Sequence, residues 1–166
     1  MQSVSVDDGS GGSGQTSEEV ALKKQNLVQE VMKFVPMLLR LPQETRAQLS
    51  REIEIKAYSA ETIIFHVGQE DSGFVYFVLS GTVGVFRETE PVAGLNVPMV
   101  KRGKGDMLGE IELLEDRARQ VTAKVLTESR LILISRETVF RHQDLLDVVR
   151  HFHGLVARTE FWGRLT

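Results

Sequence analysis

The segment best suited to chemistry runs from Gly105 to Ala123 and reads GDMLGEIELLEDRARQVTA. Gly109 and Glu110 open a very short apolar turn, and Arg119 precedes the next expected strand. Backbone N–H groups at the start of a short helix point at an anion, and an arginine adds a charged fork suited to phosphate oxygens. A glutamate beside them can accept hydrogen bonds from sugar hydroxyls. The spacing therefore indicates a pocket for an anion that also carries a sugar.

Short strand-like segments surround this pocket. They are rich in β-branched or aromatic residues and comprise Thr62–Val67, Phe74–Leu79, Thr82–Arg87, Val97–Lys101, Val121–Leu126 and Leu131–Ser135. Glycines lie between them, where turns require positive φ. Many short strands with such turns indicate an all-β barrel or jelly roll. The order of helix, strands and helix has no βαβ alternation, which argues against a doubly wound nucleotide-binding fold.

Helical patterns flank the strands. On the N-terminal side Ser17 is the expected N-cap, and a second helix opens at Pro42 with Leu49 and Ile53 facing inward. The apolar stripe of the first helix consists of Val20, Leu27, Val31, Phe34 and Leu38. On the C-terminal side a helix from about Glu137 to Phe161 is predicted by the stripe Leu145, Val148, Val149, Phe152, Leu155 and Val156.

The composition excludes several classes of protein. The chain has 166 residues, 42% of them hydrophobic, which fits one domain with a core. It has no cysteine, so disulfides and cysteine-ligated zinc are excluded and a cytoplasmic location is expected. The net charge is −3 and the basic residues are scattered, so the sequence has no cluster of basic residues of the kind that binds nucleic acid. The longest apolar runs fall far short of the ~20 residues that span a bilayer.

The sequence divides into four parts. Residues 1–18 contain a Gly-Ser run and are expected to be a disordered linker or a remnant of cloning. Residues 19–58 form an N-terminal helical segment, residues 59–135 a β-roll with the chemical segment at 105–123, and residues 136–166 the C-terminal helices. A helix-turn-helix for DNA binding would need a further segment beyond this point.

Two stretches together resemble the cyclic-nucleotide-binding domain of protein kinase A regulatory subunits, nucleotide-gated channels, nucleotide-regulated exchange factors and the bacterial catabolite activator. The first is Gly68–Ser72 followed by Val75–Gly81, similar to a glycine-acid and apolar-strand signature of that family. The second resembles its phosphate-binding cassette and consists of Gly105-Asp106, Leu108-Gly109-Glu110, Leu113-Leu114 and Arg119. The resemblance covers roughly residues 30–160. It implies a jelly-roll β-barrel with N-terminal helices and a C-terminal lid helix.

The resemblance also implies roles for individual residues. Glu110 would accept from the ribose 2′-hydroxyl of cAMP or cGMP, and Arg119 would pair with the cyclic phosphate. Backbone groups would complete the phosphate cradle at Gly109, Ile111, Glu112 and Gln120. The C-terminal helix, Glu137–Trp162, would close over the base, with Phe161 or Trp162 as a cap or else as a packing or partner contact. Ligand binding would then be read by a protein partner or an adjoining domain, without a cofactor.

Two residues depart from the family pattern and leave alternatives open. The family prefers a small residue at Glu112 and alanine at Val121. A carboxylate beside a phosphate site repels the ligand unless it points to solvent, and the simplest interpretation of Glu112 is a solvated charge. Arg119 could equally form a salt bridge with Glu110 or Glu112. The pocket could then be empty in a protein-interaction or assembly domain, or could hold an uncharged nucleoside, against which the retained Arg119 argues.

No catalytic arrangement is evident in the sequence. His151 and His153 form an H-x-H pair, but residues two apart on a helix do not share a face. A metal-dependent cupin would need that pair on strands with a spaced glutamate, so no metal is expected. The sequence has no P-loop and no G-x-S-x-G elbow. We therefore expect a sensor and not an enzyme.

Overall fold

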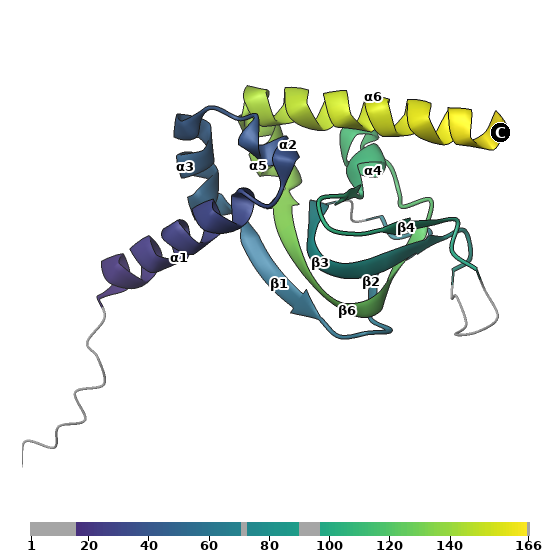
Figure 1. Ribbon diagram of the computed structural model, residues 1–166, viewed down its shortest axis with the longest axis horizontal. Coiled ribbons are helices and arrows are strands. Elements are labelled where there is room, and N and C mark those ends of the chain that lie inside the picture. Colours follow the sequence, from purple (N-terminus) through teal and green to yellow (C-terminus); the bar gives the residue numbers. More distant parts are fainter. Residues whose placement is uncertain (1–15, 71–72, 90–96, 166) are drawn as a thin grey trace, which may run out of the picture.

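The computed structural model describes residues 16–70, 73–89 and 97–165, with side chains described up to residue 154. The helices are α1 (Ser17–Met32), α2 (Pro36–Leu39), α3 (Gln43–Glu52), α4 (Glu110–Glu115), α5 (Arg136–Arg141) and α6 (Gln143–Leu165). The strands are β1 (Glu54–Tyr58), β2 (Ile63–Phe65), β3 (Phe74–Phe86), β4 (Val100–Arg102), β5 (Met107–Leu108) and β6 (Thr122–Ser135). Figure 1 shows α1, α2, α3 and α5 at one end of the strands, while α6 runs past α4.

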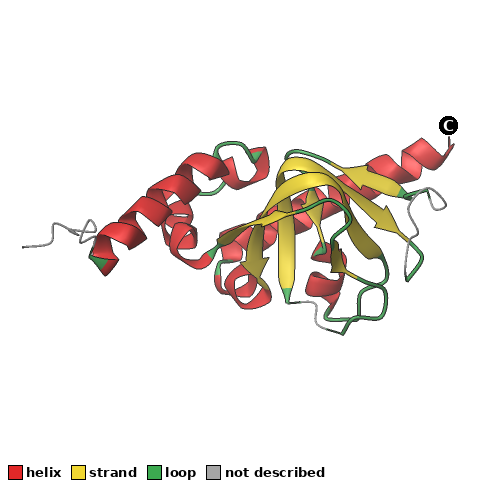
Figure 2. Cartoon of the chain, turned by 90° about the horizontal axis from the view of Figure 1, so that it is seen from below, coloured by secondary structure: helices red, strands yellow, loops and turns green. Residues whose placement is uncertain are grey.

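The strands form one antiparallel sheet that curves into a roll, as Figure 2 shows. Its hydrogen-bonded order is β1-β6-β3-β4, with β2 also paired to β6 and β5 to β3. The strands at the two ends of this path, β1 and β4, do not pair with each other within the described part of the chain. The jelly-roll fold is therefore confirmed, whereas closure into a barrel is not.

Strands β3 and β6 are each longer than the sequence predicted. Two expected strands merge in each: the turn expected at Gly81 is a bend inside β3, and the break expected between Leu126 and Leu131 lies within β6. Gly81 has a φ of +89°, and a Cβ there would collide with the Ser129 side chain and the Glu128 carbonyl. The pairing of β3 with β6 shifts register between Val78 and Val83. A glycine bulge therefore bends the strand without ending it.

The core lies on both faces of β3, because successive side chains of a strand point to opposite sides. Val75 and Phe77 pack against the helices, whereas Tyr76 and Val78 face the interior of the roll. Burial on both faces explains why this strand is a continuous apolar run without alternation. The helical cover includes Leu38, Leu49, Ile53, Leu113, Leu145 and Val149, so the inward orientation of Leu49 and Ile53 is confirmed.

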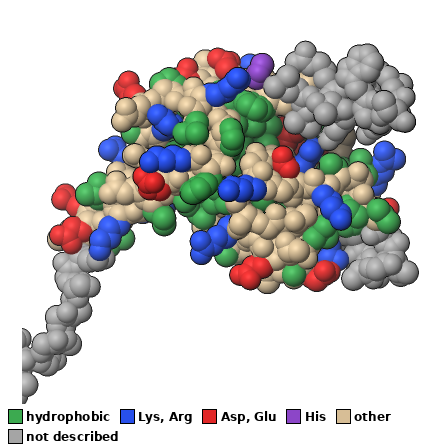
Figure 3. Space-filling model, viewed as in Figure 1, with side chains coloured by type: hydrophobic (Ala, Val, Ile, Leu, Met, Phe, Trp, Pro, Cys, Tyr) green, Lys and Arg blue, Asp and Glu red, His purple; other side chains and the backbone are tan. Residues whose placement is uncertain are grey.

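The first helix differs from the prediction in its cap and its buried face. Thr16, not Ser17, is the N-cap, and its hydroxyl accepts from the backbone N–H of Glu19 at 3.2 Å. The buried residues of α1 are Val28 and Met32, which the predicted stripe did not include. Within the stripe Leu38, which lies in α2, is buried, whereas Val20, Leu27 and Phe34 are exposed. Only the last turns of α1 reach the core, and Figure 3 shows hydrophobic and charged side chains mixed along the rest. Residues 1–15 of the expected linker lie outside the described residues.

Two predicted boundaries are wrong. Residues 54–58, expected in the helical segment, form strand β1, because pairing with β6 overrides the weak local helical pattern. The single C-terminal helix expected from Glu137 is two helices, since His142 has an extended backbone between α5 and α6. Ser135 caps α5 through its hydroxyl, which accepts from the N–H of Thr138. Within the described ranges no helix is long and apolar enough to cross a membrane.

The bend at Gly81 yields a stability prediction. Gly81→Ala combines a positive φ, which costs ~1–2 kcal/mol for a residue with a Cβ, with overpacking against β6. We expect the free energy of unfolding in urea to fall by about 2–4 kcal/mol. Gly103→Ala is the matched control, because a Cβ at Gly103 meets no atom within 4 Å. Equal effects of the two substitutions would contradict this account of the bend.

Candidate ligand-binding site

The Gly-Glu pair of the chemical segment is placed by the junction between β5 and α4. Gly109 is the N-cap of α4 and has a φ of +78°. A Cβ at Gly109 would lie 2.6 Å from Nη1 of Arg119 and 3.2 Å from the carbonyl oxygen of Phe74. Glycine is therefore required here, because the arginine side chain packs directly against this backbone.

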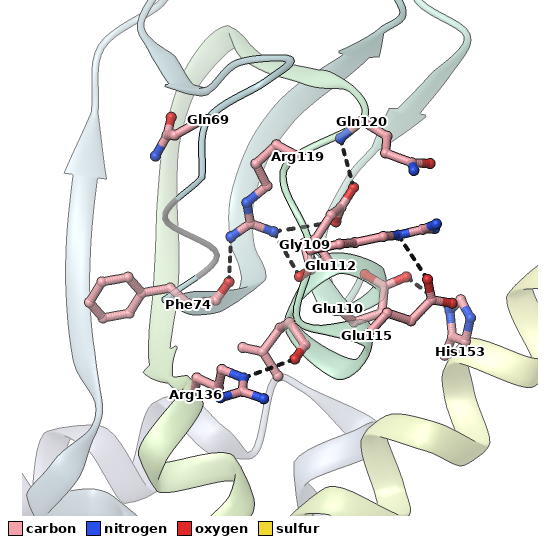
Figure 4. Close-up of polar contacts among 12 residues, drawn as sticks. Gln69, Phe74, Gly109, Glu110, Glu112, Glu115, Arg119, Gln120, Arg136 and His153 are labelled. Atoms are coloured by element: carbon pink, nitrogen blue, oxygen red, sulfur yellow. Dashed lines mark hydrogen bonds and ion pairs between the residues drawn. The ribbon is translucent and has the colours of Figure 1, made fainter.

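Arg119 lies at the centre of the site and is only 2% exposed. Its Nη1 donates to the carbonyl of Gly109 and its Nη2 to the carbonyl of Phe74, both at 2.8 Å (Figure 4). The guanidinium lies over the ring of Phe65 at 4.2 Å from the centroid. The Arg119 backbone exchanges hydrogen bonds with the turn at Gly68 and Gln69, at 2.8 and 2.9 Å. The two sequence stretches that carry the family resemblance therefore meet at this residue.

Glu112 pairs with the guanidinium of Arg119. Its Oε2 lies 3.4 Å from Nη1 of Arg119, and its Oε1 accepts from the backbone N–H of Gln120 at 3.1 Å (Figure 4). The side chain is 4% exposed, so the interpretation of Glu112 as a solvated charge is wrong. The alternative of a salt bridge between Arg119 and Glu112 is confirmed. A buried guanidinium requires a counter-charge, and the chain supplies one from α4.

Glu110 connects the site to the C-terminal helix. It is 6% exposed, and its Oε1 lies 3.3 Å from Nδ1 of His153 on α6. Burial raises the pKa of the Glu110 carboxyl above its ordinary value of 4.5, and nearby His153 and Arg102 offset part of that increase. The side chains of Phe161 and Trp162 lie outside the described residues, so the base cap stays a prediction.

Two cavities adjoin Glu110. The smaller one, about 140 Å³, lies inside the roll and is lined by Phe65, Val85, Met99, Val100, Arg102, Met107, Leu108, Gly109, Glu110, Ile111, Glu112, Gln120 and Val121. The larger one, about 410 Å³, lies toward the helices and shares Arg102, Met107 and Glu110 with it. Gly109, Glu110, Ile111, Glu112 and Gln120 are therefore brought together at one cavity. Arg119 is not among its lining residues, whereas Glu112 and Phe65, which contact the guanidinium, are.

The sequence analysis missed two residues of this site. His153 was considered only as a metal ligand, although it lies four positions after buried Val149, on the inward face of α6. Arg102 ends β4, next to the turn that leads into the chemical segment, and its charge acts on Glu110. Among the residues described, no group of three or more His, Cys, Asp or Glu side chains is placed to hold a metal ion.

An antiparallel roll with a buried arginine at an anion site, covered by a helix that contacts the pocket, defines a ligand-binding module. The family profile described as "Cyclic nucleotide-binding domain" matches residues 55–143. The chain belongs to this family. The resemblance drawn from its two sequence stretches is therefore confirmed.

Relatives and structural neighbours agree with this assignment. The cAMP-dependent protein kinase regulatory subunit of Emericella nidulans is 26% identical over 144 residues, which are 87% of this chain and 32% of that protein. The chain thus spans about a third of the length of this relative. Such relatives are regulatory subunits and not catalytic proteins.

Two solved structures have the same fold at 20% identity. One is a triple-substituted regulatory subunit of a cAMP-independent protein kinase A from Trypanosoma brucei, bound to cAMP in the A site (TM-score 0.72, 89% of this chain, 53% of that chain). The other is the Trypanosoma cruzi counterpart bound to guanosine (TM-score 0.68, 84% of this chain, 52% of that chain). At this identity the likeness establishes the fold alone.

The buried pair predicts a large effect of removing one partner. Arg119→Met leaves Glu112 buried without a counter-charge, so the free energy of unfolding in urea should fall by about 3–5 kcal/mol. Arg117→Met, which breaks a half-exposed pair with Glu115, is the matched control and should cost at most about 1 kcal/mol. The double variant Arg119→Met/Glu112→Leu should recover most of the loss. A double variant as unstable as Arg119→Met would contradict the pairing.

The raised pKa of Glu110 predicts a pH-dependent stability. Because the pKa of Glu110 is above 4.5 in the folded protein, the folded protein binds the proton of this carboxyl more tightly than the unfolded chain does. The contribution of Glu110 to the free energy of unfolding therefore falls as pH rises from 4.5 through the folded-state pKa. Glu110→Gln should therefore be more stable than the wild type at pH 7, and the difference should shrink as pH falls toward 4.5. Urea unfolding between pH 4 and pH 8 measures this.

Two controls isolate the buried carboxyl of Glu110. Glu115→Gln removes an exposed carboxylate from the same helix, and a His153→Gln background removes the imidazole that contacts Glu110. If the gain from Glu110→Gln were the same at every pH in that background, burial of the charged form would not be its cause.

Proposed function

We propose that this chain is a regulatory sensor domain that binds a nucleotide-derived ligand and transmits binding through α6 to a partner or an adjoining domain, without catalysing a reaction. One observation carries the proposal: the carboxylate of Glu110 lines the cavity and also contacts His153 of α6 at 3.3 Å. The group that would hold the ligand is therefore also a contact that holds the helix.

Competition at Glu110 provides the mechanism. Ribose hydroxyls donate to a carboxylate, and in this mechanism the ligand hydroxyl donates to Oε1 of Glu110, the oxygen that now contacts His153. Loss of this contact would free α6 to change position, and a ligand that favours the new position shifts the population toward it. Phe161 or Trp162, near the end of α6, would then cover the base.

The ligand class follows from the family and its members. The relatives named as cAMP-dependent regulatory subunits support cAMP or cGMP, for which Arg119 and the N–H of Gln120 would hold the phosphate once Glu112 moves aside. The cAMP-bound Trypanosoma brucei structure carries three substitutions, one of which replaces a glutamate by alanine. The Trypanosoma cruzi protein holds guanosine. The same fold thus accepts both a cyclic nucleotide and a nucleoside.

The names of the relatives also support a class of partner. A regulatory subunit of a protein kinase acts on another protein, so a kinase catalytic subunit is the partner that these names favour. An assembly domain with an empty pocket is less well supported, because the cavity is lined by residues to which the resemblance assigns ligand contacts, among them Glu110 and Gln120.

Thermal unfolding with added ligand tests the proposal. cAMP, cGMP, adenosine and guanosine are each added to the wild type and to Glu110→Ala. A ligand at 100 times its dissociation constant stabilises the folded state by about 2.7 kcal/mol, and each kcal/mol shifts the midpoint by ~2–4 °C for a domain of this size. We expect a shift of several degrees with at least one ligand, lost in Glu110→Ala. No shift with any of the four at millimolar concentration would reject the proposed function.

The contact between α6 and Glu110 predicts the effect of His153. His153→Ala removes the competitor for the Glu110 carboxylate, so the affinity for the stabilising ligand should rise by about fivefold, corresponding to one hydrogen bond of ~1 kcal/mol. His151→Ala is the matched control, because His151 lies on the same helix with an exposed side chain and packs on Phe152. Isothermal titration calorimetry measures both. An unchanged affinity in His153→Ala would mean that α6 is not coupled to the pocket through this contact.

A further inference from the structure

We infer that the pocket selects an uncharged nucleoside over a cyclic nucleotide, because Glu112 serves as a permanent internal anion in the phosphate position. This inference rests on the proposed function and names the ligand class of that same site. It begins from the contacts of Glu112, whose two carboxylate oxygens meet Arg119 and the N–H of Gln120 at 3.4 and 3.1 Å. These are the groups that the family resemblance assigns to the phosphate.

The cavity presents carboxylates and not the arginine. Glu110 and Glu112 both line the space of about 140 Å³, whereas Arg119 does not. Both terminal nitrogens of Arg119 are engaged, with the carbonyls of Gly109 and Phe74 and with Glu112 itself. The retained arginine, which argued against a nucleoside on sequence grounds, is therefore already neutralised inside the protein.

The hydrogen-bonding chemistry of the two ligand classes differs at this position. In a cyclic nucleotide the 3′ and 5′ oxygens are esterified to one charged phosphate, so that end of the ligand offers only acceptors and a negative charge. In a nucleoside the same oxygens are hydroxyls, which donate. An ionised carboxylate only accepts, so Glu112 complements the hydroxyls and repels the phosphate.

A cyclic nucleotide can bind only if it replaces Glu112. Replacement breaks the buried pair with Arg119 and the bond from Gln120, and it must also find a new place for a carboxylate that is now buried. A nucleoside leaves these bonds in place. We therefore expect the affinity of the wild type for a cyclic nucleotide to be at least about tenfold below that for the matching nucleoside, since breaking a buried pair is costly.

The remainder of the cavity is suited to a base but requires adjustment. Its walls include apolar side chains from three strands, among them Val85, Val100 and Met107. A volume of about 140 Å³ is below the ~300 Å³ at which ligand pockets begin. The neighbouring cavity of about 410 Å³ shares Arg102 and Met107 with it, both of which are long side chains with several rotatable bonds. A change of rotamer at these side chains would join the two spaces and make room for a complete nucleoside.

The test compares paired ligands by isothermal titration calorimetry on the full chain: adenosine with cAMP, and guanosine with cGMP. In the wild type the nucleoside should bind at least about tenfold more tightly than its cyclic nucleotide. In Glu112→Ala the anion position is open, so the cyclic nucleotide should gain about tenfold or more and the nucleoside should lose affinity. Glu115→Ala, which removes an exposed carboxylate from the same helix, should leave both affinities unchanged.

The outcomes separate this inference from the proposed function. Tighter binding of the cyclic nucleotide by the wild type, or an unchanged preference in Glu112→Ala, would overturn the inference and leave the sensor function intact. Binding of none of the four ligands would overturn both. Should Glu112→Ala fail to fold, Glu112→Gln keeps the size of the side chain and removes its charge. The preference for the nucleoside should fall in that variant as well, and an unchanged preference would overturn the inference.

Discussion

The burial of one guanidinium constrains the whole site. Arg119 is enclosed by the roll, where an unpaired charge is costly, so the surrounding chain provides a carbonyl from Gly109, another from Phe74 and a carboxylate from Glu112. A glycine at position 109 is required for the first of these contacts. The turn between β2 and β3 is bonded to the backbone of the same arginine. The loops that meet at the pocket are thus held by the side chain and the backbone of a single residue.

The sequence predicted the members of this site better than their arrangement. Gly109, Glu110 and Arg119 were recognised because their residue types and spacing are specific. The burial of Glu112 was not predicted, since local spacing does not say which exposed-looking carboxylate a buried arginine will recruit. That choice depends on how α4 sits against the chain after residue 116, which is a tertiary property. The role of His153 was missed for the same reason, because its partner is distant in sequence.

The fold shows the same division between local and tertiary information. Apolar runs and glycines located β2, β3, β4 and β6 but missed β1 and β5. The inward positions of α3 were correct. Whether Gly81 ends a strand or bends it depends on the close approach of Ser129 from β6, which no local pattern contains. The exposed stripe of α1 has a similar cause: helical periodicity identifies apolar positions, but only packing decides which of them reach the core. Val28 and Met32, which lie outside the predicted stripe, reach the core because α1 meets the body of the domain at its C-terminal end.

The unfavourable environment of Glu110 explains how a small ligand could move a long helix. Burial raises the pKa of this carboxyl, so its charged form is held in the folded protein at a cost. His153 offsets part of that cost from α6, and a ligand with hydroxyl donors would offset it from the cavity. In the proposed mechanism both partners use the same oxygen of this carboxylate, so a gain for one is a loss for the other. The coupling between pocket and helix then follows from competition for one acceptor on a buried acid, and it requires no longer pathway through the fold.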